Sequence, residues 1–121
     1  MRDFVHDIDV LLLQEVVYEN FSFLPSHFAF VNISSNNKGT AIIARKSIDI
    51  SNVLLESNGR IVSLAVNGVR FVNVYGHLGS NFRRERNDLF SNLIAVHLNK
   101  QGASFSVIGG DFNNCTVEDG W

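Results

Sequence analysis

The chain has 121 residues, which is the length of one domain. Hydrophobic residues make up 45% of the sequence and charged residues 18%, and this composition excludes an intrinsically disordered chain. The formal net charge of −2 argues against a protein that binds nucleic acid through charge alone. It does not exclude an enzyme, because a bound divalent cation changes the local field.

The sequence contains neither a membrane span nor an export signal. No apolar run approaches the ~18 residues needed to cross a bilayer, and the N-terminus leads into no apolar core of signal-peptide length. We therefore expect an intracellular protein, nuclear or cytoplasmic and not secreted, with no membrane partner. The single cysteine, Cys115, forms by itself neither an internal disulfide nor a cysteine-based zinc site.

The first part of the chain predicts three strands. Residues 9–13 are apolar on both faces of an extended chain, which indicates a buried central strand. Residues 28–33 and 40–44 are predicted to form two more strands. The intervening turn is expected at residues 36–39, which end on a glycine.

Residues 60–75 carry the strongest local signal, that of a β-hairpin. Asn67-Gly68 is the pair favoured in a two-residue type I′ turn, and such a turn pairs Val66 with Val69. Both faces of this hairpin carry mainly apolar side chains. We therefore expect other elements to cover it on both sides.

The period of the apolar residues changes after the hairpin. From residue 82 to residue 97 they follow helical spacing, and residues 105–108 predict another short buried strand. This order of strands, helix and strand indicates a sheet protein with helical cover. The expected fold class is α/β (α+β), with mostly antiparallel mixed sheets.

Candidate functional residues stand directly after two of the predicted strands. Glu15 follows the first strand, where a carboxylate is costly unless it is paired, bound to metal or in solvent. Asp111 and Asn113 lie two residues apart, so an extended backbone places both on one face. The aspartate could take a proton from water and the asparagine could hold a phosphate oxygen. The structural alternative is a turn rich in Asp and Asn.

Other candidates lie between the hairpin and the predicted helix. The Tyr75 hydroxyl could donate to a phosphate, or Tyr75 is an amphipathic tyrosine at a strand end. His77 is a loop histidine, a type that more often caps or faces solvent. Arg83 and Arg84 could contact a DNA backbone, or they belong to a solvated charged face.

The order of the motifs resembles the exonuclease–endonuclease–phosphatase family, which has a DNase I-like fold. The matching segments are Leu-Gln-Glu at residues 13–15, Val-Asn-Val-Tyr at residues 72–75 and Gly-Gly-Asp-Phe-Asn at residues 109–113. The segment at residues 79–87, Gly-Ser-Asn-Phe-Arg-Arg-Glu-Arg-Asn, looks like the endonuclease domains of non-LTR retrotransposons. The resemblance covers nearly the whole chain.

The resemblance implies metal-dependent hydrolysis of a phosphodiester, with DNA as the substrate. Glu15 would bind Mg²⁺ or Mn²⁺, and Tyr75 would donate a hydrogen bond to the scissile phosphate. Asp111 would orient or deprotonate the attacking water, and Asn113 would help to hold the phosphate. Further candidates for substrate binding are His77, Arg83 and Arg84.

The resemblance also implies a four-layer α/β/β/α sandwich, of which residues 1–121 form a part. Family members carry an asparagine upstream of the Glu15 strand and end with a Ser-Asp-His segment, and neither has a match here. We therefore expect a partial domain without the first strand and the C-terminal part, inactive alone, joined to a reverse transcriptase in the intact polypeptide.

Two alternatives stay open at the level of sequence. One is a truncated remnant with no catalytic role. The other is a family member that acts on a lipid or a small phosphoester. The second alternative draws on His77, which stands where retrotransposon endonucleases usually have proline.

Overall fold

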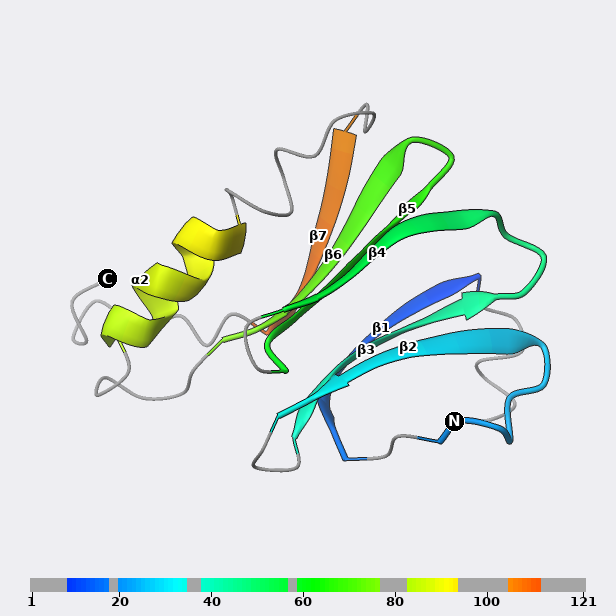
Figure 1. The fold of residues 1–121 in the computed structure, drawn as a ribbon, viewed down its shortest axis with the longest axis horizontal. Helices are drawn as coiled ribbons and strands as arrows, with labels where there is room; N and C mark the ends of the chain where they lie inside the picture. The colour runs from blue at the N-terminus through cyan, green and yellow to red at the C-terminus, as the bar shows by residue number, and fades with distance from the viewer. Residues whose placement is uncertain are drawn as a thin grey trace.

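The computed structural model of the chain describes residues 9–17, 20–34, 38–56, 59–76, 83–93 and 105–111. Two β-sheets form most of this part of the chain (Figure 1). No helix in these ranges is long and apolar enough to cross a membrane. The elements, in chain order, are β1 (Val10–Val16), β2 (His27–Ile33), β3 (Gly39–Arg45), β4 (Ile50–Glu56), β5 (Ile61–Val66), β6 (Val69–Tyr75), α2 (Arg83–Asn92) and β7 (Phe105–Asp111).

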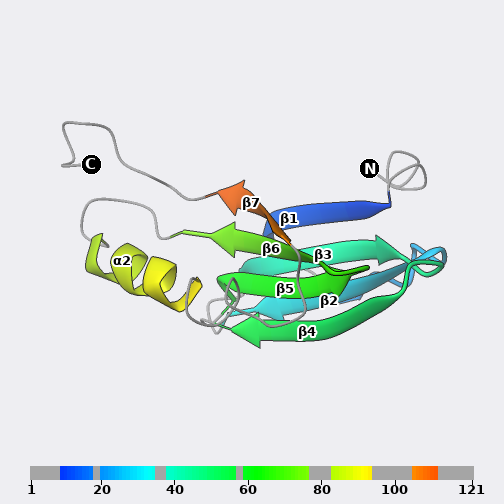
Figure 2. The same cartoon turned by 90° about the horizontal axis from the view of Figure 1, so that it is seen from above.

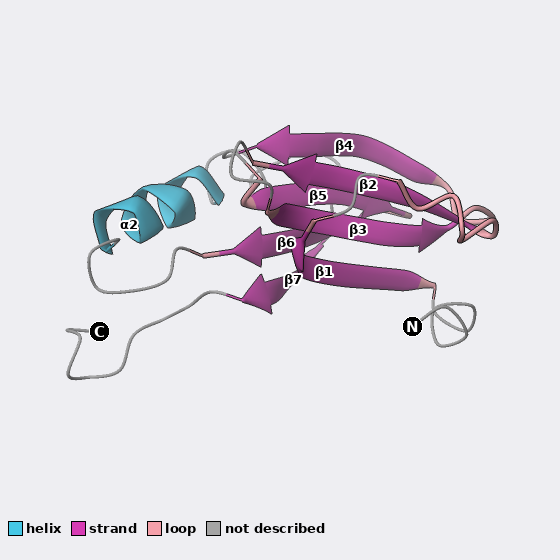
Figure 3. Cartoon of the chain, turned by 90° about the horizontal axis from the view of Figure 1, so that it is seen from below, coloured by secondary structure: helices cyan, strands magenta, loops and turns pink. Residues whose placement is uncertain are grey.

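The two sheets lie one above the other as separate layers in Figure 1, and they overlap when seen from above or below (Figures 2 and 3). One has three antiparallel strands in the order β1-β3-β2, and the other has four in the order β4-β5-β6-β7. All neighbours in the second sheet are antiparallel except β6 and β7, which run parallel. The segment that contains α2 connects these two strands, because parallel neighbours need a crossover. The mixed, mostly antiparallel sheets are those that the sequence predicts.

The β5–β6 hairpin is covered on both sides, as expected. Its inner face, with Val62 and Leu64, packs with Ile42 of β3 in the interior of the sandwich. Its outer face, with Val72, packs against Leu89 of α2. Two covered faces explain why this hairpin is mainly apolar on both faces instead of alternating regularly with polar residues.

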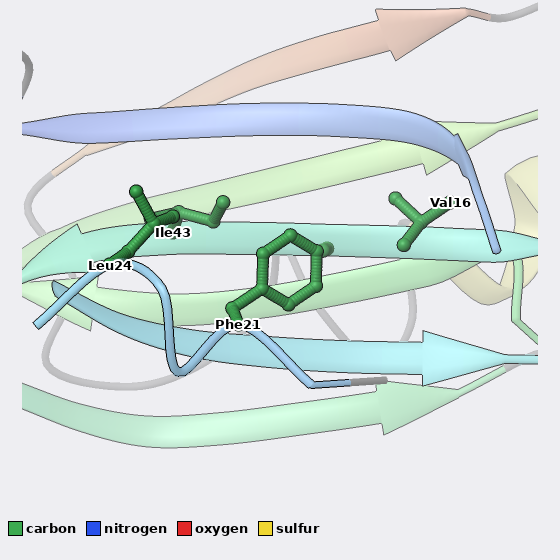
Figure 4. Close-up of a cluster of buried hydrophobic side chains, with 5 residues drawn as sticks. Val16, Phe21, Leu24 and Ile43 are labelled. Atoms are coloured by element: carbon green, nitrogen blue, oxygen red, sulfur yellow. The ribbon is translucent and has the colours of Figure 1, made fainter. Parts of the chain in front are cut away.

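The outer face of the three-stranded sheet is covered by the segment between β1 and β2. Phe21 and Leu24 from this segment form an apolar cluster with Ile43 of β3 and Val16 of β1. In this cluster Leu24 lies next to Ile43, and Phe21 lies between Ile43 and Val16 (Figure 4). Phe21 is 8% exposed and Leu24 is 1% exposed. A short irregular segment therefore closes this face among the described residues.

The structure differs from the predicted elements in a few places. β4 was not predicted, because it is a half-exposed edge strand without regular alternation and has a register shift between Ser51 and Leu54. β1 extends to Val16 and β7 extends to Asp111, so both strands run through the candidate site residues. The helix covers Arg83–Asn92, and the predicted helical positions 82 and 94–97 lie outside the described residues.

The predicted turn of the hairpin is confirmed. Asn67 has φ 50° and Gly68 has φ 81°, and Val66 pairs with Val69. Positive φ at both central residues is the property of a type I′ turn, whose twist matches that of the flanking strands.

Replacing Gly68 by valine is expected to destabilise the fold by about 2 kcal/mol, because a β-branched residue fits the left-handed region badly. Urea unfolding followed by circular dichroism measures this loss. The control is Gly68→Asn, which should cost less because asparagine tolerates positive φ. Equal losses for the two variants would mean that backbone strain is not the cause.

Candidate active site

Glu15 lies in a β-bulge close to the end of β1. Gln14 pairs with Thr40 of β3 and Val16 pairs with the neighbouring Gly39, so Glu15 is the extra residue between them. Its φ is 56°, a left-handed conformation that glutamate rarely adopts. The bulge lets Val16 join the outer apolar cluster while the Glu15 side chain stays exposed.

The exposed Glu15 carboxylate reaches a strand of the other sheet. The hydroxyl of Tyr75, the last residue of β6, donates to Glu15 Oε1 at 3.3 Å. Burial raises the pKa of Tyr75 above its ordinary value, and the negative charge of Glu15 raises it further. The phenol therefore keeps its proton at neutral pH and acts as a donor.

Asp111 reaches the same place from β7. It is the register partner of Tyr75 in the parallel pair, and its carbonyl oxygen accepts from the Gly76 amide at 2.6 Å. The negative charge of Asp111 also raises the pKa of Tyr75, its register partner. The two glycines before it let β7 approach β1 and β6 closely, because a Cβ on Gly109 would lie 2.6 Å from Leu12 Cδ1.

Arg60 completes this cluster, and the sequence did not single it out. Its guanidinium lies 4.6 Å from the centroid of the Tyr75 ring. Its Nη1 donates to the carbonyl oxygens of Tyr75 at 3.2 Å and Gly76 at 3.0 Å. The positive charge of Arg60 lowers the pKa of Tyr75 and so opposes the two carboxylates. The available signal was its position directly before β5, opposite the end of β6.

The donor set fits a hard divalent cation. Glu15 and Asp111 supply carboxylates, and both are exposed. Magnesium is usually held by one or two carboxylates, with water and substrate phosphates as its other ligands. Among the described residues no cluster offers three or more His, Cys, Asp or Glu side chains to one metal ion. Two carboxylates of this kind could serve as ligands of an ion that takes its other ligands from water and substrate.

The structure brings together three of the predicted site residues, which are Glu15, Tyr75 and Asp111. Arg83 and Arg84 are exposed in the first turn of α2, on an element separate from the three strands. The predictions for His77 and Asn113 concern positions outside the described residues. The shared feature of the three gathered residues is that each lies at or next to the end of a strand.

Comparison with known proteins identifies the family and the fold. The profile of the Endonuclease/Exonuclease/phosphatase family matches residues 1–119. No curated protein sequence matches the chain. Several solved structures share its fold, so the expected DNase I-like sandwich is confirmed.

Three of these structures illustrate the similarity. TDP2 from C. elegans is 21% identical with a TM-score of 0.65, covering 98% of this chain and 41% of its own. An AP endonuclease from Archaeoglobus fulgidus is 20% identical with a TM-score of 0.66, covering 92% and 50%. ANGEL2, a 2',3'-cyclic phosphatase, is 20% identical with a TM-score of 0.60, covering 93% and 42%. The chain thus spans about half or less of each solved protein.

Proposed function

Because the chain belongs to the Endonuclease/Exonuclease/phosphatase family, we propose that it is part of an enzyme that hydrolyses phosphodiester bonds with a divalent metal ion. The observation that carries the proposal is the meeting of Glu15, Tyr75 and Asp111 from three strands of two sheets. Two exposed carboxylates beside a protonated phenol supply a ligand for a cation, a base for water and a donor for phosphate oxygen.

Each side chain has a role in this proposal. Glu15 holds Mg²⁺ or Mn²⁺, which when bound neutralises charge on the phosphate. Tyr75 turns its hydroxyl from Glu15 to a phosphate oxygen, and Asp111 orients or deprotonates the attacking water. Asn113 holds the phosphate from the segment after β7. Arg60 holds the Tyr75 ring in place, because its guanidinium lies over the ring face and donates to the carbonyl oxygens of Tyr75 and Gly76.

DNA is the proposed substrate, and retrotransposon-type nicking is the proposed reaction. The segment at residues 79–87 supports this choice by its likeness to non-LTR retrotransposon endonucleases. Similar solved structures include an AP endonuclease and a TDP2 complexed with a single-strand DNA product. The exposed Arg83 and Arg84, together with His77, would contact the DNA backbone. By the same likeness, we propose that the intact protein acts inside the cell and carries a reverse transcriptase in the same polypeptide.

We further propose that residues 1–121 are part of a longer catalytic domain. The solved relatives are about twice as long as the matched region, and the sequence lacks counterparts of the upstream asparagine and the Ser-Asp-His segment. Groups that act together in catalysis lose more than a proportional share of rate when some are missing.

A plasmid-nicking assay with Mg²⁺ or Mn²⁺ tests both proposals. The intact polypeptide that contains this segment is expected to nick supercoiled DNA, and its Glu15→Ala variant is expected to lose this activity. The 121-residue chain is expected to show no nicking, because each missing preorganised donor is worth roughly 10²–10³ in rate.

Three other results would correct the proposals in different ways. Glu15-dependent nicking by the 121-residue chain would disprove the partial domain. An intact polypeptide that cleaves lipid or small phosphodiesters but not DNA would disprove the substrate. Activity on none of these substrates would favour a non-catalytic remnant.

A further inference from the structure

A row of three polar side chains crosses the interior of the sandwich just before the site. Gln14 and Asn32 are both register partners of Thr40, so the three lie side by side on β1, β2 and β3. Gln14 and Asn32 donate to strands of the other sheet, and Thr40 donates to the turn between β4 and β5. The acceptors are Asn73 Oδ1 for Gln14 at 2.6 Å, the Gly59 carbonyl for Thr40 at 3.1 Å, and the Glu56 and Ile61 carbonyls for Asn32 at 2.9 and 3.1 Å.

The bond between Gln14 and Asn73 is part of a larger junction. Asn73 of β6 is fully buried, and its Nδ2 donates to the carbonyl oxygens of Leu13 and Ala41, each at 2.8 Å. Both N–H groups are thus used on β1 and β3, which leaves Oδ1 to accept from Gln14. A buried amide in this position ties β6 to two strands of the facing sheet, because a buried polar group that loses its hydrogen bonds is destabilising.

This junction is adjacent to the site on both strands. Gln14 directly precedes Glu15, where the bulge begins, and Asn73 lies two residues before Tyr75 on the same face of β6. The junction therefore fixes the two backbone segments whose side chains meet in the bond between Tyr75 and Glu15. The left-handed backbone at Glu15 persists only when its surroundings hold it.

We propose that Gln14 and Asn73 are positioning residues of the active site, and that their hydrogen bond sets the Glu15 carboxylate against the Tyr75 hydroxyl. This inference deepens the proposed function and rests on it, since Glu15 there is the metal ligand. Groups that support a metal ligand typically contribute a factor of about 10–100 to metal affinity. The opposing explanation is that the row only joins the sheets, and then any of its three members would matter equally to the site.

The sharpest variants are Gln14→Met and Asn32→Leu, each made in the intact polypeptide with an isotope-labelled tyrosine incorporated site-specifically at position 75. The first removes only the Gln14 donor and keeps both bonds from Asn73 to the facing carbonyls. It is preferable to a change at Asn73, which would remove the whole junction and risk unfolding. The second removes the matched bonds of the same row at β2, away from Glu15. Both remove a half-buried amide that bridges the sheets.

The first measurement follows the ring resonances of isotope-labelled Tyr75 by NMR, with Glu15→Ala, which removes the acceptor, as the reference for a lost contact. Gln14→Met is expected to reproduce most of the shift of Glu15→Ala, and Asn32→Leu is expected to leave Tyr75 at its original position. An unchanged Tyr75 in Gln14→Met, or equal shifts in both variants, would overturn the inference. This result is independent of metal and of activity.

The second measurement is Mn²⁺ affinity by calorimetry. Gln14→Met is expected to weaken binding about 10-fold, and Asn32→Leu is expected to leave it unchanged. Equal weakening in both variants would contradict a positioning role. If the wild type binds no Mn²⁺, the proposed metal site fails, while the NMR measurement still decides whether Gln14 positions Glu15.

Discussion

Replacing Glu15 by glycine is expected to stabilise the fold by about 0.5–1 kcal/mol and to lower the activity of the intact enzyme at least about 10²-fold. The backbone at Glu15 is left-handed, with φ 56°, which costs a non-glycine residue about 1–2 kcal/mol. Glycine removes that strain. Its greater conformational freedom in the unfolded chain offsets part of the resulting gain in stability. The exposed side chain contributes little packing that glycine would lose.

The matched control is Glu15→Gln, which keeps the strain and the shape but removes the charge. It is expected to stay within about 0.5 kcal/mol of the wild type, as substitutions of exposed residues usually do, and to lose activity like the glycine variant. Urea unfolding and the nicking assay separate the two effects. A glycine variant less stable than the glutamine variant would show that the side chain, through its bond to Tyr75, supports the bulge.

The β-bulge at Glu15 explains why the sequence predicts Glu15 as a site residue but does not predict its backbone conformation. The polar residue after an apolar run marks the strand end, and the resemblance supplies a role for it. The bulge itself depends on pairing with β3, where Gln14 and Val16 take neighbouring partners. No local property of the segment specifies that pairing, so the sequence predicted a strand that stops before Glu15.

Features set by local sequence were predictable, whereas features set by contacts between distant strands were not. The turn at Asn67 and Gly68 is predictable, because few residues adopt its backbone angles. The place of Arg60 in the site depends instead on the fold, because Arg60 contacts the Tyr75 ring and two backbone carbonyls at the end of β6. Asn73 was part of a recognised motif, yet its partners lie on two strands of the facing sheet. Such contacts follow from the assembled sandwich and have no signature in the sequence.

The pair Gly109 and Gly110 gives the largest expected effect on stability. A methyl group on Gly110 would overlap the carbonyl oxygen of Val74, and φ at Gly110 is 132°, where other residues are rarely found. Gly110→Ala is therefore expected to cost about 3 kcal/mol, because the backbone of β7 must move away from β6. Since Asp111 follows directly on β7, the same movement would carry it away from Tyr75.

Gly109→Ala is the internal comparison, since it adds the same methyl group one residue earlier. That group would meet only the Cδ1 atom of Leu12, at the far end of a flexible side chain. Leu12 is half-buried and can rotate, so the expected loss is about 1 kcal/mol. Urea unfolding of the two variants side by side measures the difference. Equal losses would mean that β7 is not held against the backbone of β6, and that the placement of Asp111 beside Tyr75 does not depend on the close approach at Gly110.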